Sequence, residues 1–360
     1  AIGCVEPTAP GKTLGSTDAG MYNMALALEM ALNEGCQFGS DRQIGVKTPP
    51  VSSMKSMDDV LDAYKVQVKH QLGKLHADLQ KCEQFHAEYH PTPISSATLE
   101  GCLEQGVCST QGGAKYNFSG IQGTGMAVVA DSLGAIESAV FEDKWLTLEE
   151  LVAHLKDNLS DEVVRTRLEG IDKFGNDIPK ADAWMKWVGD HYSDSIHALG
   201  KNTRGGQHLA GVYSNTSHTH FGGLVGALPN GRRAGETYAS GFAPENGADK
   251  RGTTALLNSM NRIDYKKFAN GINFNIKLDA SSYDCEEGRD ALASLYKVYF
   301  KRHGMQVQAN MLDPKILIEA RDNPELHPNL LIRVSGYSAY FNDLSPEMQD
   351  EVIGRSSNKG

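Results

Sequence analysis

The sequence is poor in cysteine, in long apolar runs and in positive charge. Only six of its 360 residues are cysteines, and no two form a Cys-x-x-Cys pair. This excludes a small disulfide-bonded scaffold and favours a reducing compartment, the cytoplasm. No apolar run approaches the length of a membrane span, so we expect no membrane partner. The formal net charge of -10 and an isoelectric point near 5.7 argue against a nucleic-acid partner.

What the sequence contains is typical of a globular protein. Hydrophobic residues make up 40% and charged residues 22% of the chain. The length allows one large domain or two ordinary ones, with enough residues for a sizeable core. There is no internal repeat, no low-complexity tract and no convincing linker.

Apolar periodicity predicts helices that alternate with strands in the second half of the chain. Helices are expected at residues 21–33, 57–85, 96–107, 125–141, 146–159, 161–171, 179–198, 286–303 and 314–322, with a last one beginning near 345. Strands are expected at residues 209–214, 221–228, 272–278, 306–311 and 330–334. This alternation indicates an α/β fold.

The most informative motifs lie near the two ends of the chain. Gly336 follows the apolar run at residues 330–334, and alone it would only give the backbone freedom to turn. It is not alone, because it stands within Arg333-Val334-Ser335-Gly336-Tyr337 and ahead of a polar segment at residues 342–349. At the other end the chain reads Gly3-Cys4-Val5-Glu6-Pro7.

Together these motifs resemble the radical loop and the cysteine finger of the glycyl radical enzymes. The resemblance covers essentially the whole chain but only the C-terminal part of the family's chain, so we expect a fragment, a processed piece or one half of a split enzyme. It implies an α/β fold, the C-terminal half of a ten-stranded barrel. The half barrel would span residues 1–320 and begin with the cysteine finger loop (1–20), and a glycine radical domain would follow at residues 321–360.

The resemblance also assigns roles to the motif residues. Gly336 would store a radical on its α-carbon, where a side chain would crowd the planar geometry. Cys4 would use it as a thiyl radical, and since the two are 332 positions apart (336 − 4), only the fold can bring them together. In an extended segment Glu6 points to the same side as Cys4 and could act as a general base. Arg333 and Tyr337 would position the radical loop.

Within the family, the residues around the cysteine resemble those of the glycerol and 1,2-propanediol dehydratases. Asp18 falls where an aspartate holds a substrate hydroxyl, and Tyr213 falls where a tyrosine lines the diol pocket. Leu209 stands where sulfonate-cleaving relatives carry an arginine. Ser16 and Thr17 depart from the Trp-His of those dehydratases, and the pocket's His and Ser come from the N-terminal part that this chain lacks.

The function implied is the dehydration of a small diol to an aldehyde. The resemblance implies no bound cofactor and no metal, a radical on Gly336 installed by a radical S-adenosylmethionine activating enzyme, and a cytoplasmic or microcompartment location. We expect the N-terminal half of the enzyme, or a second copy, as a partner. Two alternatives stay open: another Cys-Val-Glu lyase or decarboxylase, acting for instance on choline, hydroxyproline or an aryl acetate, and a non-catalytic fragment or spare-part subunit. A single cysteine at position 4 disfavours formate-lyase activity, and its presence together with Glu6 weighs against a spare part.

Three further motifs are better explained as structural. Residues 11–13 (Gly-Lys-Thr) lack the earlier glycine of a phosphate loop, which would have to stand at Glu6. Residues 123–125 (Gly-Thr-Gly) lack the third glycine and the acidic residue of a dinucleotide turn. His218 and His220 would share one face of a strand, but no third metal ligand stands at a recognisable spacing, which favours ordinary hydrogen-bonding histidines.

Overall fold

The computed structural model describes residues 4–40, 42–278 and 280–356. Its strands are β1 (Thr13–Asn23), β2 (Tyr116–Thr124), β3 (His208–Gly211), β4 (Asn275–Lys277), β5 (Gln308–Asn310), β6 (Leu331–Arg333) and β7 (Ser338–Tyr340). Its helices are α1 (Met24–Leu32), α2 (Met57–Tyr89), α3 (Pro93–Ser96), α4 (Cys102–Gln105), α5 (Met126–Ile136), α6 (Leu148–Lys156), α7 (Glu162–Glu169), α8 (Pro179–His197), α9 (Ser217–Gly223), α10 (Gly252–Met260), α11 (Glu286–Lys301), α12 (Pro314–Asp322) and α13 (Pro346–Ser356). The expected mixed α/β class is confirmed.

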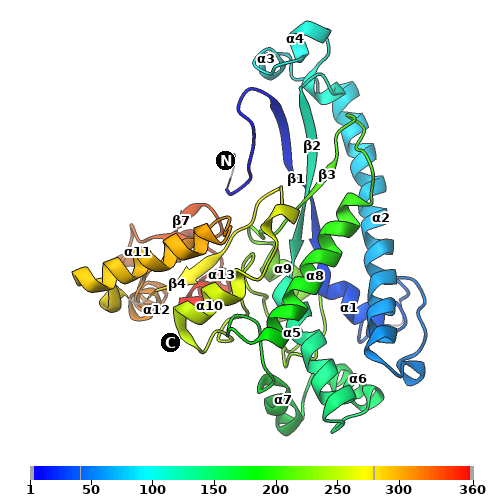
Figure 1. The fold of residues 1–360 in the computed structure, drawn as a ribbon, viewed down its shortest axis with the longest axis vertical. Helices are drawn as coiled ribbons and strands as arrows, with labels where there is room; N and C mark the ends of the chain where they lie inside the picture. The colour runs from blue at the N-terminus through cyan, green and yellow to red at the C-terminus, as the bar shows by residue number, and fades with distance from the viewer. Residues whose placement is uncertain (1–3, 41, 279, 357–360) are drawn as a thin grey trace.

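Parallel strands in sequence order form the centre of the molecule (Figure 1). β1 pairs with β2 and β2 with β3, all parallel, and β4 pairs with β5 in the same sense. A parallel bridge between Val212 and Ile272 continues the ladder from β3 towards β4. The antiparallel pair β6–β7 forms a separate hairpin, which we call the glycine hairpin (residues 331–340) because Gly336 lies in its turn.

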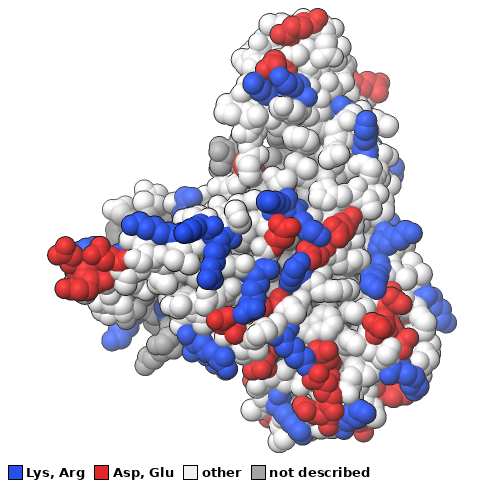
Figure 2. All heavy atoms as spheres, viewed as in Figure 1, with Lys and Arg blue, Asp and Glu red and all other residues white. Residues whose placement is uncertain are grey.

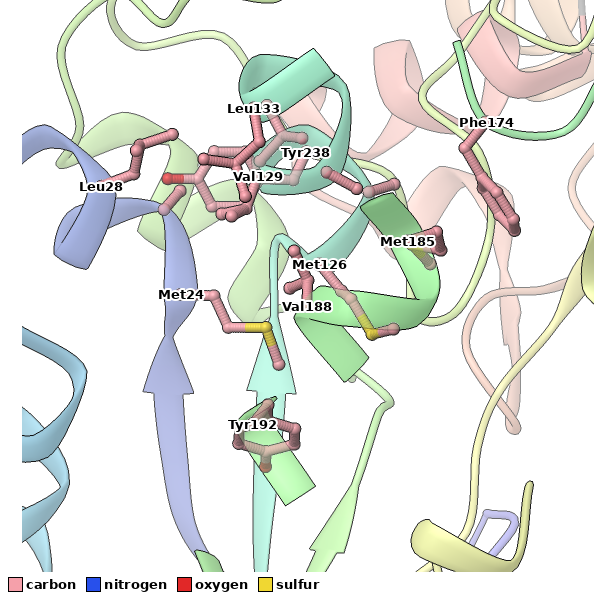
Figure 3. Close-up of a cluster of buried hydrophobic side chains, with 14 of the residues drawn as sticks. Met24, Leu28, Met126, Val129, Leu133, Phe174, Met185, Val188, Tyr192 and Tyr238 are labelled. Atoms are coloured by element: carbon pink, nitrogen blue, oxygen red, sulfur yellow. The ribbon is translucent and has the colours of Figure 1, made fainter. Parts of the chain in front are cut away.

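The main core lies between the long strands and the helices α1, α5 and α8 (Figure 3). Every residue of α5 is buried, which explains why its sequence is apolar apart from Asp131 and Ser132. Met24 and Met126 fill the space above the end of the sheet, beside Val188 and Tyr192 of α8. At Gly123 of β2, an added Cβ would meet the Met24 methyl group and the Tyr192 ring, so only glycine allows this packing.

A second, smaller core lies under the glycine hairpin. Its buried members come from α12, β6, α13 and the turns between them: Leu317, Ala320, Ile332, Val334, Phe341, Met348, Val352 and Ile353. Partly buried apolar residues from Leu312 to Leu344 complete it. Residues 312–353 therefore share an apolar centre apart from the main core, and the domain boundary expected at residue 321 stays a prediction.

The apolar pattern does not predict β1 or β2, and it places a helix at residues 21–33 that begins only at Met24. β1 is built from small and polar residues because it packs closely on neighbouring backbone and side chains. At Gly20, for instance, an added Cβ would lie 3.1 Å from Leu75 of α2. The strand ends at Asn23, whose side chain accepts a hydrogen bond from the Leu26 amide (3.3 Å) and so caps α1.

Two other sequence predictions are wrong. The strand expected at residues 221–228 is instead the end of α9 followed by an irregular segment wrapped around Arg232. This buried guanidinium donates to the backbone carbonyls of Gly222, Gly226 and Glu236, which replaces strand pairing. The helix expected at residues 96–107 is broken into α3 and α4, because Gly101 adopts a φ of 100° between them.

No helix of the described ranges is long and apolar enough to cross a membrane. On the face that Figure 2 shows, Lys and Arg side chains lie interspersed with Asp and Glu over most of the surface.

Candidate active site

An irregularity in β1 places Asp18. The register with β2 runs evenly to Ser16 and resumes at Gly20, so two extra residues of β1 leave the ladder between them. The bulged backbone is held by Gln122 and Asn270, whose side-chain amides both donate to the carbonyl of Thr17 (3.1 and 2.8 Å). Bulges of this kind turn a side chain away from its regular direction. Here the bulge lets Asp18 reach Tyr213.

Glu6 is brought to the same place by the segment at residues 4–7. The segment runs past Gly271, where an added Cβ would lie 2.7 Å from the Val5 carbonyl oxygen and 3.1 Å from the Glu6 Cα. Gly271 has a φ of 95°, so glycine is favoured there by both conformation and space. The Glu6 side chain is 1% exposed and accepts a hydrogen bond from the Thr17 hydroxyl (3.1 Å).

Tyr213 joins the two carboxyl groups. It follows β3, is fully buried, and its hydroxyl lies 2.7 Å from Glu6 Oε1 and within hydrogen-bonding contact of Asp18 Oδ1. Burial, followed by these two carboxylates, raises the pKa of Tyr213 far above its ordinary value, so the phenol keeps its proton. The carboxyl groups of Glu6 and Asp18 therefore share one neutral hydrogen-bond donor, the Tyr213 hydroxyl.

Cys4 and Gly336 are in direct contact, although they lie at opposite ends of the chain. Gly336 is buried with a φ of 85°, and a Cβ added to it would overlap the Cys4 Cβ and lie 3.2 Å from the Cys4 Sγ. The α-hydrogen of Gly336 in the position of an L side chain therefore points at Cys4. The fold brings together the two residues that the sequence motifs singled out.

The environment keeps Cys4 and Asp18 in their protonated forms more than usual. Burial raises the pKa of the Cys4 thiol, and the nearby Glu6 and Asp18 carboxylates raise it further, while Arg333 opposes them. Burial also raises the pKa of Asp18, against the hydrogen bond from Tyr213, which lowers it. A sulfur that keeps its hydrogen is the form that can donate a hydrogen atom, since a thiolate has none to give.

Two protein-family models match the chain. Residues 1–222 match the family model described as pyruvate formate lyase-like, and residues 238–342 match the one described as glycine radical. The first match contains Cys4, Glu6, Asp18 and Tyr213, and the second contains Gly336. The chain belongs to the glycyl radical enzymes. The resemblance inferred from the sequence motifs is confirmed.

Solved glycyl radical enzymes superpose closely on the chain. It is similar to the glycerol-bound B12-independent glycerol dehydratase from Clostridium butyricum, with 38% identity and a TM-score of 0.94 over 98% of this chain and 45% of that one. It is also similar to a structure from Roseburia inulinivorans that concerns 1,2-propanediol dehydration. The identity is 35% and the TM-score 0.95, over 99% of this chain and 45% of that one.

A curated relative gives the same picture at the level of sequence. The trans-4-hydroxy-L-proline dehydratase of Clostridioides difficile is 33% identical over 98% of this chain and 45% of its own length. The chain thus spans about half the length of the relatives that it matches.

Amide side chains that the sequence analysis missed hold the glycine hairpin of this glycyl radical enzyme. Asn273 donates to the Ser335 hydroxyl (2.7 Å), and Gln308 accepts from the Gly336 amide (3.3 Å) and from Arg333 Nε (3.1 Å). A signal was present, because Asn273, Asn275, Gln306, Gln308 and Asn310 alternate with apolar residues in strands, where asparagine is rare. Tyr337 packs partly buried against the second core, beside the turn that it is expected to position.

The histidine pair does not form the arrangement expected for it. His218 and His220 lie on α9 rather than on a strand, and a spacing of two residues turns them about 200° apart on a helix. His218 is buried 3.8 Å from Glu351, whereas His220 is exposed. Within the described part of the chain, no three His, Cys, Asp or Glu side chains gather closely enough to hold a metal ion.

The remaining motifs are structural. Lys12 pairs with the Glu100 carboxylate (3.7 Å) at the surface, where a phosphate loop would direct its lysine to a nucleotide. A cavity of about 670 Å³ opens elsewhere, between α7, the start of α8 and residues 230–251, and none of the candidate residues named above lines it. The candidate chemistry therefore lies at Cys4 and Gly336, away from this cavity.

Proposed function

We propose that this chain carries both radical centres of a glycyl radical carbon–oxygen lyase. Gly336 stores the radical, and Cys4 exchanges a hydrogen atom with it. The observation that carries the proposal is the direct packing of Gly336 against the Cys4 side chain. An α-carbon radical on glycine is stabilised by the flanking amide groups, and a thiol can return a hydrogen atom to it at modest cost.

The proposed substrate is a small vicinal diol, glycerol or 1,2-propanediol. The Cys4 thiyl takes a hydrogen atom from C1, and Glu6 accepts the proton of the C1 hydroxyl as a general base. The C2 hydroxyl, held by Asp18 and Tyr213, departs with that proton as water. The product radical recovers its hydrogen atom from the Cys4 thiol, so the net reaction converts a diol into an aldehyde and water.

Several contacts support these roles. Glu6 is buried beside Cys4, as a base for the substrate carbon would need to be, and Thr17 and Tyr213 orient it. Leu209, in place of a cation, suits a neutral polyol better than a sulfonate. The likeness to a glycerol-bound glycerol dehydratase points to the same class of substrate.

We infer that the parallel ladder from β1 to β5 is half of a ten-stranded barrel. A complementary N-terminal half, or a second copy of the chain, would cover its open edges, because unpaired strand edges are rarely left exposed. A radical S-adenosylmethionine activating enzyme would act on Gly336. Arg333 and Tyr337 would then position the loop that bears the radical.

The test is an anaerobic activation followed by electron paramagnetic resonance. The protein, alone and with an N-terminal half from a relative, is treated with an activating enzyme and S-adenosylmethionine. A doublet that is lost in Gly336→Ala, and propionaldehyde formed from 1,2-propanediol, are the expected results. Glu6→Gln should keep the doublet and abolish turnover, so full activity in that variant would exclude the base assignment.

A second candidate is a Cys-Val-Glu lyase for a cyclic amino acid, favoured by the 33% identity to trans-4-hydroxy-L-proline dehydratase. The same activated protein distinguishes the two. Dehydration of hydroxyproline without any aldehyde from propanediol would select this candidate. Radical formation without turnover of either substrate would count against both.

A further inference from the structure

Gln308 is a buried side chain amide whose orientation is fixed from both sides. It begins β5, is 8% exposed, and lies directly opposite Asn275 in the parallel register of β4 and β5. Paired residues of neighbouring strands point to the same face. Gln308 Nε2 accordingly donates to Asn275 Oδ1 at 2.6 Å, which leaves the amide oxygen directed towards the glycine hairpin.

The amide oxygen of Gln308 accepts two hydrogen bonds from that hairpin. One comes from the Gly336 backbone N–H (3.3 Å) and one from Arg333 Nε (3.1 Å). A flipped amide would turn its NH₂ group towards two donors and its oxygen towards an acceptor, so only one orientation satisfies all three contacts. Asn275 adds support from below, because its Nδ2 lies 3.5 Å from the Val334 carbonyl oxygen.

Gly336 depends on such backbone contacts more than another residue would. It has no side chain to anchor it, and its φ of 85° is one of several values open to glycine. Its reactive α-hydrogen faces Cys4 only while the peptide plane between Ser335 and Gly336 keeps its orientation. The hydrogen bond from the Gly336 N–H to Gln308 fixes that plane.

We propose that Gln308 is the positioning residue of the glycyl radical. Its amide oxygen accepts the hydrogen bond from the Gly336 N–H, which fixes the orientation of that peptide and keeps the Gly336 α-carbon directed at Cys4. An acceptor on this N–H also increases electron donation from the nitrogen to the α-carbon, which stabilises a radical there. This inference rests on the proposed radical function, and it concerns a residue that acts through Gly336 and does not touch the substrate.

The first experiment needs no radical. Protein labelled with ¹⁵N-glycine is compared as Gln308→Leu, Gln308→Glu and Gln306→Leu, with hydrogen exchange read at the Gly336 amide. Gln306 is the matched control, because its amide oxygen also accepts a backbone N–H, that of Phe274 (2.7 Å), which lies outside the hairpin.

In Gln308→Leu we expect exchange at Gly336 to accelerate roughly tenfold, the equivalent of one lost hydrogen bond. The other labelled glycines report whether the fold is kept. Gln308→Glu retains an acceptor and should restore protection, and Gln306→Leu should leave Gly336 unchanged. Unaltered exchange at Gly336 in Gln308→Leu would overturn the proposal.

The second experiment reads the radical itself. After activation, Gln308→Leu should give a changed coupling of the exchangeable Gly336 N–H proton and a radical that decays several-fold faster, while Gln306→Leu and Gln308→Glu resemble the parent. An identical spectrum and lifetime in Gln308→Leu would overturn the radical role. If the parent forms no radical, the proposed function fails and so does that role, while the exchange result still decides whether Gln308 orients Gly336.

Discussion

At the scale of single residues, the site depends on which protons stay in place. Cys4 sits beside Glu6 and Asp18, and burial together with these carboxylates raises the pKa of its thiol. A raised pKa keeps the S–H bond intact to a higher pH than in an ordinary cysteine. Glu6 is therefore a charge that keeps Cys4 protonated, in addition to its proposed role as acceptor of a substrate proton.

Glu6→Gln is expected to lower the pKa of Cys4, because it removes the larger of the two carboxylate effects. The measurement is the rate of Cys4 alkylation against pH, resolved by peptide mass spectrometry. In the variant the rise of this rate should shift to lower pH. The exposed Cys285 in the same sample serves as the internal control. An unshifted Cys4 profile would contradict the proposed charge coupling.

Gly336→Ala is expected to destabilise the fold for two separable reasons. The positive φ costs a Cβ-bearing residue about 1 kcal/mol, and overlap with the Cys4 Cβ adds to this cost. Gly205→Ala is the matched control, since Gly205 has a φ of 82° and open space around it. Urea unfolding should show a larger loss for Gly336→Ala than for Gly205→Ala. Cys4→Gly should remove the excess, and an excess that persists would rule out the steric contact.

At the scale of elements, the sequence predicts what local periodicity determines. The amphipathic helices α2, α8 and α11 follow from their apolar spacing, and α2 also begins with a Ser56–Asp59 capping box. The residues of β1, by contrast, suit contacts with parts of the chain that are distant in sequence. Its small residues and its bulge suit β2 and Tyr213, neither of which a local pattern can reveal. The amides Asn275 of β4 and Gln308 of β5 likewise contact a hairpin 59 and 25 residues further along the chain.

The buried α5 carries Asp131, whose carboxyl accepts from the Phe174 amide at 2.9 Å. Burial raises its pKa from 3.8 to about 6. The folded state therefore binds more protons than the unfolded state between about pH 4 and 6, and the free energy of unfolding falls by about 3 kcal/mol as the pH rises through this window. Asp131→Asn should abolish this fall while keeping the bond to Phe174.

Urea unfolding at several pH values between 4 and 7 checks this expectation. The stability of Asp131→Asn relative to the parent should increase with pH up to about 6 and then level off. A difference between Asp131→Asn and the parent that does not vary with pH would contradict the assignment.

At the scale of the whole molecule, the two residues proposed to carry the radical could be named from sequence, but their contact could not. The motifs around Cys4 and Gly336 consist of neighbouring residues, so they can be recognised in a single sequence. Their contact depends on how the glycine hairpin, with its own small core, docks on the parallel strands. Three of the contacts that dock it are polar, through Asn273, Asn275 and Gln308. The alternation of these amides with apolar residues is visible in the sequence, but the hairpin that they bind is not.

The presence of two separate apolar cores predicts that different parts of the chain differ in stability. Residues 312–353 share only a small apolar core and meet the main body through polar contacts, whose net contribution is about 1 kcal/mol each. We therefore expect this unit to open at a lower free energy than the parallel sheet. Hydrogen exchange in low urea should show its amides exchanging together, ahead of those of β2 and α5.

Two core variants separate local opening from global unfolding. Ile332→Ala, in the small core, should cost the unit about 2 to 4 kcal/mol and accelerate exchange at residues 312–353 while leaving β2 protected. Leu133→Ala, in the main core, should accelerate exchange throughout, because opening of the sheet removes the surface on which the hairpin docks. Equal acceleration everywhere by both variants would mean that the chain unfolds as one unit. In that case the two cores would unfold together, and Gly336 could be exposed only when the parallel sheet beside Glu6 and Tyr213 unfolds as well.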